Sequence, residues 1–495
     1  VVGHNGRLAW GITNVGADVQ DLYVERRNPE NPREFAYEGR WEEATIVREE
    51  IAVRGWLKPE ALEILYTRHG PVLNADVPGE APLALSWTAL APTRLWRSIL
   101  RLNTAADWQE FRTAVVDFDA PAQNFVYADR EGNIGYQMSG RIPLRAWGDG
   151  LLPVPGWSAA YDWQGFIPFD ALPSAFNPPE GFIATANDRV VPADYPYLIT
   201  HEWAPSFRVQ RIKEMLAGKE RLDVDDMRAI QADLYSSLAR LLVPYALEAG
   251  QRGQAGEWGE PQAMSEKALA TLANWDYVLR PGDAATAVYS VFYNRLIRRT
   301  FADELGPELF RLYLAQGRSP ALAVASALVD EANPWFDDVS TPERETRDEI
   351  VWQCLEEAAG LLAGRFGAEV GDWQWGRLHT TTFAHPLGRL PLLDRLFNRG
   401  PFPRGGDAST VNVSGYSMLA PYREGHHPSL RMIVDLSDWD EALAVLPLGQ
   451  SGQPLSPHYD DQMGLWLAGE YNRLGFERAT VERGAAARLE LVPAG

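Results

Sequence analysis

Alternating apolar and polar residues dominate the first 215 residues of the chain and predict β-strands separated by long connections rich in Pro and Gly. The clearest case is NFVYADREGNIGYQM, residues 124–138, where an aromatic and β-branched run meets the turn residues REGN and then an alternating run. This order predicts a β-hairpin. A shorter run, residues 182–186, is also predicted as a strand.

The spacing of apolar residues becomes helical near Val224. The run VDDMRAIQADLYSSLARLLVPYALEA, residues 224–249, predicts one helix, and further runs of the same period continue to about Gly367. Strands and turns then return, and SLRMIVDLSD, residues 429–438, predicts a buried strand. We therefore expect three parts, 1–215, 216–367 and 368–495, and an α+β fold in which a helical block interrupts a layered, β-rich core.

Composition narrows the possible classes of protein. The chain of 495 residues has 67 acidic and 46 basic side chains and a formal net charge of −21. Nucleic acid is not an expected partner, because phosphate binding needs a basic surface. A membrane is not expected either, since no apolar run reaches the ~18–20 residues of a membrane span. The single cysteine, Cys354, excludes disulfides and CxxC metal sites within the chain. The 18 Trp, 18 Tyr and 18 Phe leave an aromatic-lined, carbohydrate-active protein open.

The common catalytic motifs do not occur in this sequence. It has no G-x-S-x-G, H-E-x-x-H or G-x-x-x-x-G-K-[ST] pattern, and its histidines are scattered, so spacing supports no catalytic triad. Asp18 and Asp21 flank Gln20 and offer oxygens that calcium prefers, although such a pair is also typical of a solvated loop. The amide of Asn187, after the predicted strand 182–186, suits either an oxyanion donor or a turn.

Ten stretches occur in a fixed order along the chain: GHNGRLAWGITNVGADVQDLY, NFVYADREGNIGY, GRIPLR, LLPVPG, WQGFIPFDALP, NPPEGFIATAND, FRVQRI, QADLYSSLAR, SLRMIVDLSD and GQSGQPLSPHYDDQMGLWLAGEY. Together they resemble the β-subunit of the penicillin acylase family, the N-terminal-nucleophile amidohydrolases. The resemblance extends from Gly3 to about Tyr471. It implies an αββα N-terminal-nucleophile hydrolase sandwich with an inserted helical block, and hydrolysis of N-acyl amides through an acyl-enzyme.

The resemblance also accounts for the missing triad. In the family the nucleophile is the N-terminal Ser of the β-subunit, and its own α-amino group, with a pKa of about 8, acts as the base. Because the chain starts at Val1, just before the GHN motif, it is predicted to be a β-subunit fragment that lacks this Ser and is inactive by itself. The expected partners are an α-subunit from the same precursor and a small-molecule N-acyl amide. The expected location is periplasmic or secreted.

Family roles are assigned to individual residues by motif position. Asn14 matches the position whose backbone N–H forms half of the oxyanion hole, and Asn187 matches the side-chain donor of the other half. Arg208 matches an arginine that helps to orient this asparagine and the Ser amine. The acyl-pocket positions match Val2, Ile12 and Gln123. These three residues depart from the pattern of a phenylacetyl pocket, which leaves aliphatic acyl groups, including acyl-homoserine lactones, open.

The acidic loop resembles the structural calcium site of the family, which ties the two subunits together beside the active site. The predicted ligands are Asp18, the Gln20 carbonyl, Asp21, the Gly150 carbonyl and Glu202. Glu202 is included because the family's further acid aligns with Ile199 in this chain. The alternative to an amidohydrolase is a non-catalytic, calcium-stabilised binding protein on the same fold.

Overall fold

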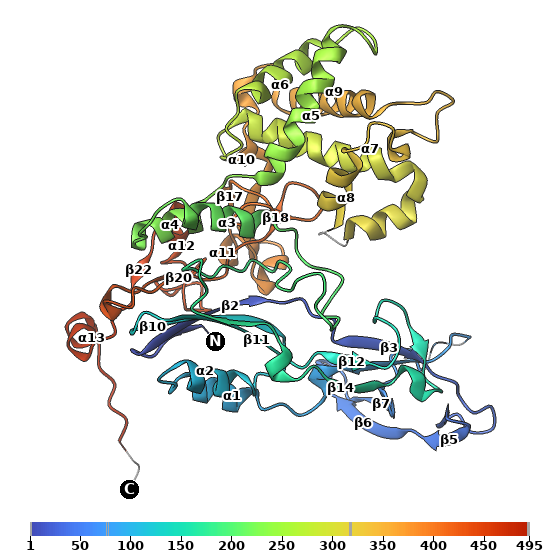
Figure 1. Cartoon of the computed structure of the whole chain (residues 1–495), viewed down its shortest axis with the longest axis vertical. Helices are drawn as coiled ribbons and strands as arrows, with labels where there is room; N and C mark the ends of the chain where they lie inside the picture. The colour runs from blue at the N-terminus through green and yellow to red at the C-terminus, as the bar shows by residue number, and fades with distance from the viewer. Residues whose placement is uncertain (1, 76, 78, 316–318, 493–495) are drawn as a thin grey trace. The chain divides into compact units, whose positions relative to one another are not determined.

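The computed structural model describes residues 2–75, 77, 79–315 and 319–492. The chain divides into two compact units, Val1–Ala204 and Pro205–Gly495 (Figure 1). The second unit contains both the helical block and the C-terminal strands. The three-part division predicted from the sequence stays a prediction.

The first unit consists mainly of β-structure. Its strands are β1 (Gly3–His4), β2 (Leu8–Asn14), β3 (Gln20–Val24), β4 (Glu34–Tyr37), β5 (Arg40–Glu43), β6 (Thr45–Ile51), β7 (Glu60–Thr67), β8 (Gly70–Pro71), β9 (Leu83–Trp87), β10 (Gln123–Asp129), β11 (Ile134–Ser139), β12 (Pro143–Arg145), β13 (Val154–Pro155), β14 (Trp163–Phe166) and β15 (Ser174–Phe176). Two α-helices, α1 (Leu95–Leu102) and α2 (Trp108–Val115), lie between β9 and β10 in the chain.

An antiparallel sheet with the strand order β1-β2-β10-β11-β15 carries the predicted oxyanion residue Asn14. Its β10–β11 pair is the predicted hairpin, in which Gln123 lies opposite Ser139 and Ala128 opposite Ile134. The hairpin prediction is therefore confirmed. Strand β2 pairs with the other edge of β10, so that Asn14 lies opposite Gln123.

The two faces of this sheet are buried differently. Helices α1 and α2 cover one face (Figure 1), where the Trp108 ring packs edge-on against Tyr127 with their centroids 5.2 Å apart. Side chains alternate between faces along a strand. Met138, Asn124 and Thr13, which lie opposite one another in register, therefore share the face away from α1 and α2.

Residues 182–186 form no strand, so this prediction was wrong. The apolar side chain of Ile183 packs against the cluster that contains Met138, which explains the apolar pattern without strand pairing. Asn187 has a φ of 65°, in the left-handed region, and this ends any extended run. The segment is a loop that runs beside the sheet.

The second unit contains most of the helices. They are α3 (Phe207–Ala217), α4 (Val224–Ala232), α5 (Ser237–Gln254), α6 (Ala263–Ala273), α7 (Ala284–Ala315), α8 (Ser319–Ala327), α9 (Arg347–Phe366), α10 (Trp375–Leu378), α11 (Asp394–Phe397), α12 (Met463–Ala468) and α13 (Arg478–Gly484). The predicted single helix over 224–249 was wrong in one respect, because the chain breaks it into α4 and α5. Asp233 is extended, and the Ser236 hydroxyl accepts a hydrogen bond from the Ala239 N–H at 3.0 Å, which caps α5.

The remaining strands follow the helical block. They are β16 (Thr380–Phe383), β17 (Arg399–Pro403), β18 (Gly415–Tyr416), β19 (Glu424–His426), β20 (Arg431–Ile433), β21 (Leu443–Val445) and β22 (Asn472–Arg473). The predicted strand over 429–438 is present as the shorter β20, with Arg431 and Ile433 buried. Over the described part of the chain, every helix is too short or too polar to cross a membrane.

Candidate active site

Strand β2 ends at Asn14, in the five-stranded sheet β1-β2-β10-β11-β15. The Val15 N–H donates to the Ala122 carbonyl at 3.3 Å. Because alternate residues of an antiparallel strand direct their N–H and C=O groups to opposite edges, those of Asn14 face away from β10. Strand β1 pairs with this edge only opposite Ala9 and Trp10. The main-chain groups of Asn14 therefore lie beyond the paired part of that edge.

Asn187 reaches the same edge from the loop after β15. Its side-chain Nδ2 donates a hydrogen bond to the Asn14 carbonyl at 2.9 Å. Its own carbonyl accepts from the Ala204 N–H at 3.0 Å. The structure thus brings Asn14 and Asn187 together across 173 positions in sequence. The N–H of Asn14 faces the same edge as its carbonyl, so this N–H and the Asn187 side-chain amide can both donate to one developing oxyanion.

The predicted acyl-pocket residues lie on or next to the first strands. Ile12 lies two residues before Asn14, on the same face of β2. Gln123 lies opposite Asn14 on β10, and its side-chain amide nitrogen, Nε2, donates to the Asn14 Oδ1 at 2.9 Å. Gln123 is buried, and its Oε1 has no hydrogen-bond partner among the described residues. Val2 is half-buried just before β1. Their role in binding an acyl group stays a prediction.

Arg208 is the second residue of α3 and belongs to the second unit. Its side chain is half-buried, and the residue has at least one polar, ring or electrostatic contact. Its predicted role in orienting the oxyanion asparagine stays a prediction.

The acidic loop holds a guanidinium. The Arg145 Nη2 lies 3.2 Å from the Asp18 Oδ1, and the Arg145 Nε donates to the Asp21 Oδ2 at 2.9 Å. A second oxygen of Asp21 accepts from Nη2, also at 2.9 Å, so this pair is bidentate. The Trp163 Nε1 donates to the same carboxylate at 2.6 Å. Burial raises the pKa of Asp18, and the charge of Arg145 opposes that rise.

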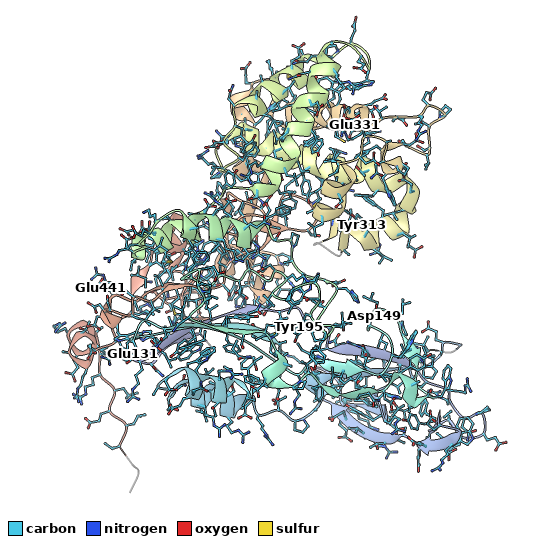
Figure 2. The ribbon with its side chains drawn as sticks, in the orientation of Figure 1. Glu131, Asp149, Tyr195, Tyr313, Glu331 and Glu441 are labelled. Carbon is cyan, nitrogen blue, oxygen red and sulfur yellow. The ribbon has the colours of Figure 1, made fainter. Side chains whose placement is uncertain are left out.

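Gly150 lies against these carboxylates. A Cβ atom on Gly150 would stand 2.4 Å from the Asp18 Oδ2 and 2.8 Å from the Asp21 Oδ1, and its φ of +82° also favours glycine. The carboxylate of the preceding residue, Asp149 (labelled in Figure 2), lies 3.2 Å from the His201 Nε2. The structure therefore brings together Gly150 and both aspartates, as the calcium prediction requires.

Other features of the loop fit calcium poorly. Arg145 occupies the carboxylate oxygens that a cation would need, and Ile199, at the position of the family's further acid, is only 2% exposed. Glu202 and Gln20 are exposed. Among the described residues, no three His, Cys, Asp or Glu side chains are grouped so that they could hold a metal ion. In this arrangement the residues do not fit a bound calcium ion, and the calcium site stays a prediction.

Sequence analysis missed the polar residues behind Asn14 and Asn187. They are Thr13, Asn124, Tyr136 and Thr185, which hydrogen-bond to one another. Asn inside a strand is unfavourable by propensity, so Asn124 within the predicted hairpin was a visible signal. Its partners are far away in sequence and had no local signal.

Asn14 and Asn187 thus form a candidate oxyanion site on an α+β fold, and comparison with known proteins identifies the family. The Penicillin amidase family model matches residues 1–483, so the chain belongs to the penicillin amidase family. The chain is similar in structure to a thermostable penicillin G acylase from Alcaligenes faecalis, with a TM-score of 0.74 and 22% identity, over 100% of this chain and 90% of that one. The predicted N-terminal-nucleophile hydrolase fold is thereby confirmed.

Curated relatives with known names include acylases of two kinds. An acyl-homoserine lactone acylase QuiP from Pseudomonas aeruginosa is 33% identical over 100% of this chain and 62% of its own length. A penicillin acylase 2 proenzyme from Pseudomonas sp. (strain SE83) is 32% identical over 99% of this chain and 62% of its own length. A penicillin G acylase from Escherichia coli is 29% identical over 79% of this chain and 48% of its own length. The chain thus spans about three-fifths of the length of the first two relatives.

Proposed function

We propose that the protein to which this chain belongs hydrolyses N-acyl amides through an acyl-enzyme. Membership of the penicillin amidase family supports this reaction, as do the names of its relatives, which are acyl-homoserine lactone acylases and penicillin acylases. In this proposal the nucleophile is the hydroxyl of an N-terminal Ser of the whole protein. Its α-amino group takes the Ser proton and later delivers it to the leaving amine.

One observation in the chain itself carries the proposal: the Asn187 Nδ2 lies 2.9 Å from the Asn14 carbonyl oxygen. This carbonyl lies past the part of β2 that pairs with β1. The N–H of Asn14 faces the same edge as its carbonyl. Both donors then serve the carbonyl oxygen of the substrate as it becomes an oxyanion. The stabilisation comes from donors that are held in place before the reaction begins.

We further propose that the acyl group is aliphatic. Ile12 and Val2 are β-branched aliphatic residues, and Gln123 adds a buried amide, which departs from an aromatic-lined phenylacetyl pocket. Acyl-homoserine lactones combine such an acyl chain with an amide bond. An α-subunit from the same precursor completes the enzyme in the periplasm or outside the cell, so the purified protein should give two chains on denaturing electrophoresis.

The proposal is tested with the full-length protein and a panel of N-acyl-homoserine lactones of increasing chain length, beside penicillin G. The freed amine and the freed acid are measured by mass spectrometry. We expect release from several N-acyl-homoserine lactones and weaker or no release from penicillin G. Protein that is correctly processed but releases amine from no substrate of the panel contradicts the proposal and favours a non-catalytic binding protein.

A further inference from the structure

Four polar side chains form a continuous hydrogen-bonded relay behind Asn14 and Asn187. The Tyr136 hydroxyl donates to the Asn124 Oδ1 at 2.7 Å. The Asn124 Nδ2 donates to the Thr13 Oγ1 at 3.1 Å, and the Thr13 Oγ1 lies 2.8 Å from the Thr185 Oγ1. We call Tyr136, Asn124, Thr13 and Thr185 the relay.

The relay extends from Tyr136 inside the sheet to Thr185 on the loop. The Tyr136 and Asn124 bonds have fixed donors, whereas either hydroxyl can donate in the Thr13–Thr185 contact, because each has one proton and two lone pairs. Asn124 has both a donor and an acceptor partner, which satisfies the amide that the sheet buries.

Burial favours a single hydrogen-bonded arrangement of the relay. Asn124 is fully buried, and Tyr136 is 8% exposed. A buried amide that lacks hydrogen-bond partners is destabilising, so Asn124 favours the one arrangement in which both ends of its amide are bonded. In that arrangement the Thr13 hydroxyl is fixed relative to strands β10 and β11.

Two members of the relay, Thr13 and Thr185, lie close in sequence to the two predicted oxyanion donors. Thr13 immediately precedes Asn14 on β2, and its side chain points to the opposite face of the sheet. Thr185 lies two residues before Asn187, on the loop that forms no strand. The contact of Thr185 with Thr13 reaches β2 directly, beside the apolar packing of Ile183 and the main-chain bond from the Ala204 N–H to the Asn187 carbonyl.

We propose that Thr13 and Thr185 are positioning residues for the oxyanion hole, and that they act through Asn187. Their 2.8 Å contact holds the loop at β2, so that the Asn187 Nδ2 meets the Asn14 carbonyl. The two neighbours of Asn187 are also bonded to each other: the Asp188 Oδ1 accepts from the Ala186 N–H at 2.9 Å, which stabilises the turn at Asn187. The catalytic consequence rests on the proposed amidase function, whereas the placement of Asn187 beside Asn14 by the two threonines does not.

The kinetic test compares Thr185→Val, which removes the hydroxyl at nearly constant volume, with Thr185→Ser, which keeps it. Displacing a catalytic donor by about 1 Å can lower a rate about 100-fold. We therefore expect Thr185→Val to lower kcat by about 10- to 100-fold with little change in KM, and Thr185→Ser to keep most of the activity. Thr45→Val, at an exposed position of β6, is the matched control and should leave kcat unchanged.

A double-mutant cycle separates positioning from general destabilisation. If Thr185 acts through Asn187, Thr185→Val should cost little further kcat in an Asn187→Ala background. The same fold-loss in both backgrounds, or an unchanged kcat in the single variant, overturns the proposal.

A crystal structure of Thr185→Val gives a readout that does not depend on activity. We expect the Asn187 Nδ2 to move out of hydrogen-bond distance of the Asn14 carbonyl. If it stays near 2.9 Å, the relay does not position Asn187, whatever reaction the protein performs. If the wild-type protein hydrolyses no N-acyl amide but Asn187 is displaced in the variant, the proposed function is overturned and the positioning role of Thr185 is supported.

Discussion

Replacing Arg145 with Met is predicted to destabilise the first unit strongly. The side chains of Arg145 and Asp21 are 5% and 6% exposed, and two hydrogen bonds of 2.9 Å join them. Arg145 also pairs with Asp18, which is 20% exposed. Removing one partner of a buried pair leaves an uncompensated charge and costs about 3–5 kcal/mol. Met keeps most of the volume, so the loss should come from charge and hydrogen bonds.

The assay is urea unfolding of the full-length protein, followed by tryptophan fluorescence. The double variant Arg145→Met/Asp21→Asn should recover part of the loss, because one of the stranded charges is then neutral. Arg48→Met is the control, since Arg48 and Glu63 form a pair at 2.7 Å that is 72% and 48% exposed and should contribute little. A loss of less than about 1 kcal/mol for Arg145→Met would show that the pair is not buried in solution.

Three further predictions concern other groups. Calcium should raise the unfolding midpoint of Arg145→Met more than that of wild type, because the guanidinium then no longer competes for the carboxylates. Calorimetric titration measures calcium affinity and thermal melting measures the midpoint. Equal affinities and equal midpoint shifts for the two proteins would refute this competition. Burial raises the pKa of the Cys354 thiol, which is fully buried in α9, so iodoacetamide should label it only after unfolding, as peptide mass spectrometry will show; rapid labelling of native protein would contradict this. Although burial acts to raise it, the pKa of Asp129 is lowered by hydrogen bonds from Tyr127, at 2.6 Å, and Asn133. Its contribution to stability should be complete above the unfolded pKa of 3.8 and lost as the pH falls below it. Acid unfolding of Asp129→Asn should then depend less on pH in that range, and an unchanged profile would exclude the contribution.

Features that depend on nearby residues were predictable from the sequence. The turn residues between β10 and β11 predicted the hairpin, and helical spacing predicted the helical block of the second unit. The break between α4 and α5 was missed because apolar spacing continues through it, whereas Ser236 caps a new helix. The apolar loop 182–186 was mistaken for a strand because the packing of Ile183 against the cluster that contains Met138 also needs an apolar residue, without any strand pairing.

Contacts between distant residues had no local signal. Asp18 and Asp21 were visible as a pair of acids, but the guanidinium that binds them lies 124 positions after Asp21. Asn14 and Asn187 were matched by family resemblance, while their meeting at 2.9 Å depends on a loop that only the folded chain brings to β2. No motif in the sequence marks Thr13 or Thr185, and their proposed positioning role depends on the contact between them in the folded chain.

The central claim is that Asn187 donates to the oxyanion of an N-acyl amide substrate. The most direct measurement is kcat and KM for Asn187→Ala in the full-length protein with its best N-acyl-homoserine lactone. Losing one oxyanion donor costs about 3–4 kcal/mol, so kcat should fall by about 10²–10³ with little change in KM and no loss of folding. Asn177→Ala is the matched control, because Asn177 also has a positive φ, of 48°, but bonds the Ile134 N–H instead. Its kcat should stay close to that of wild type, and an Asn187→Ala protein that keeps wild-type kcat would contradict the account.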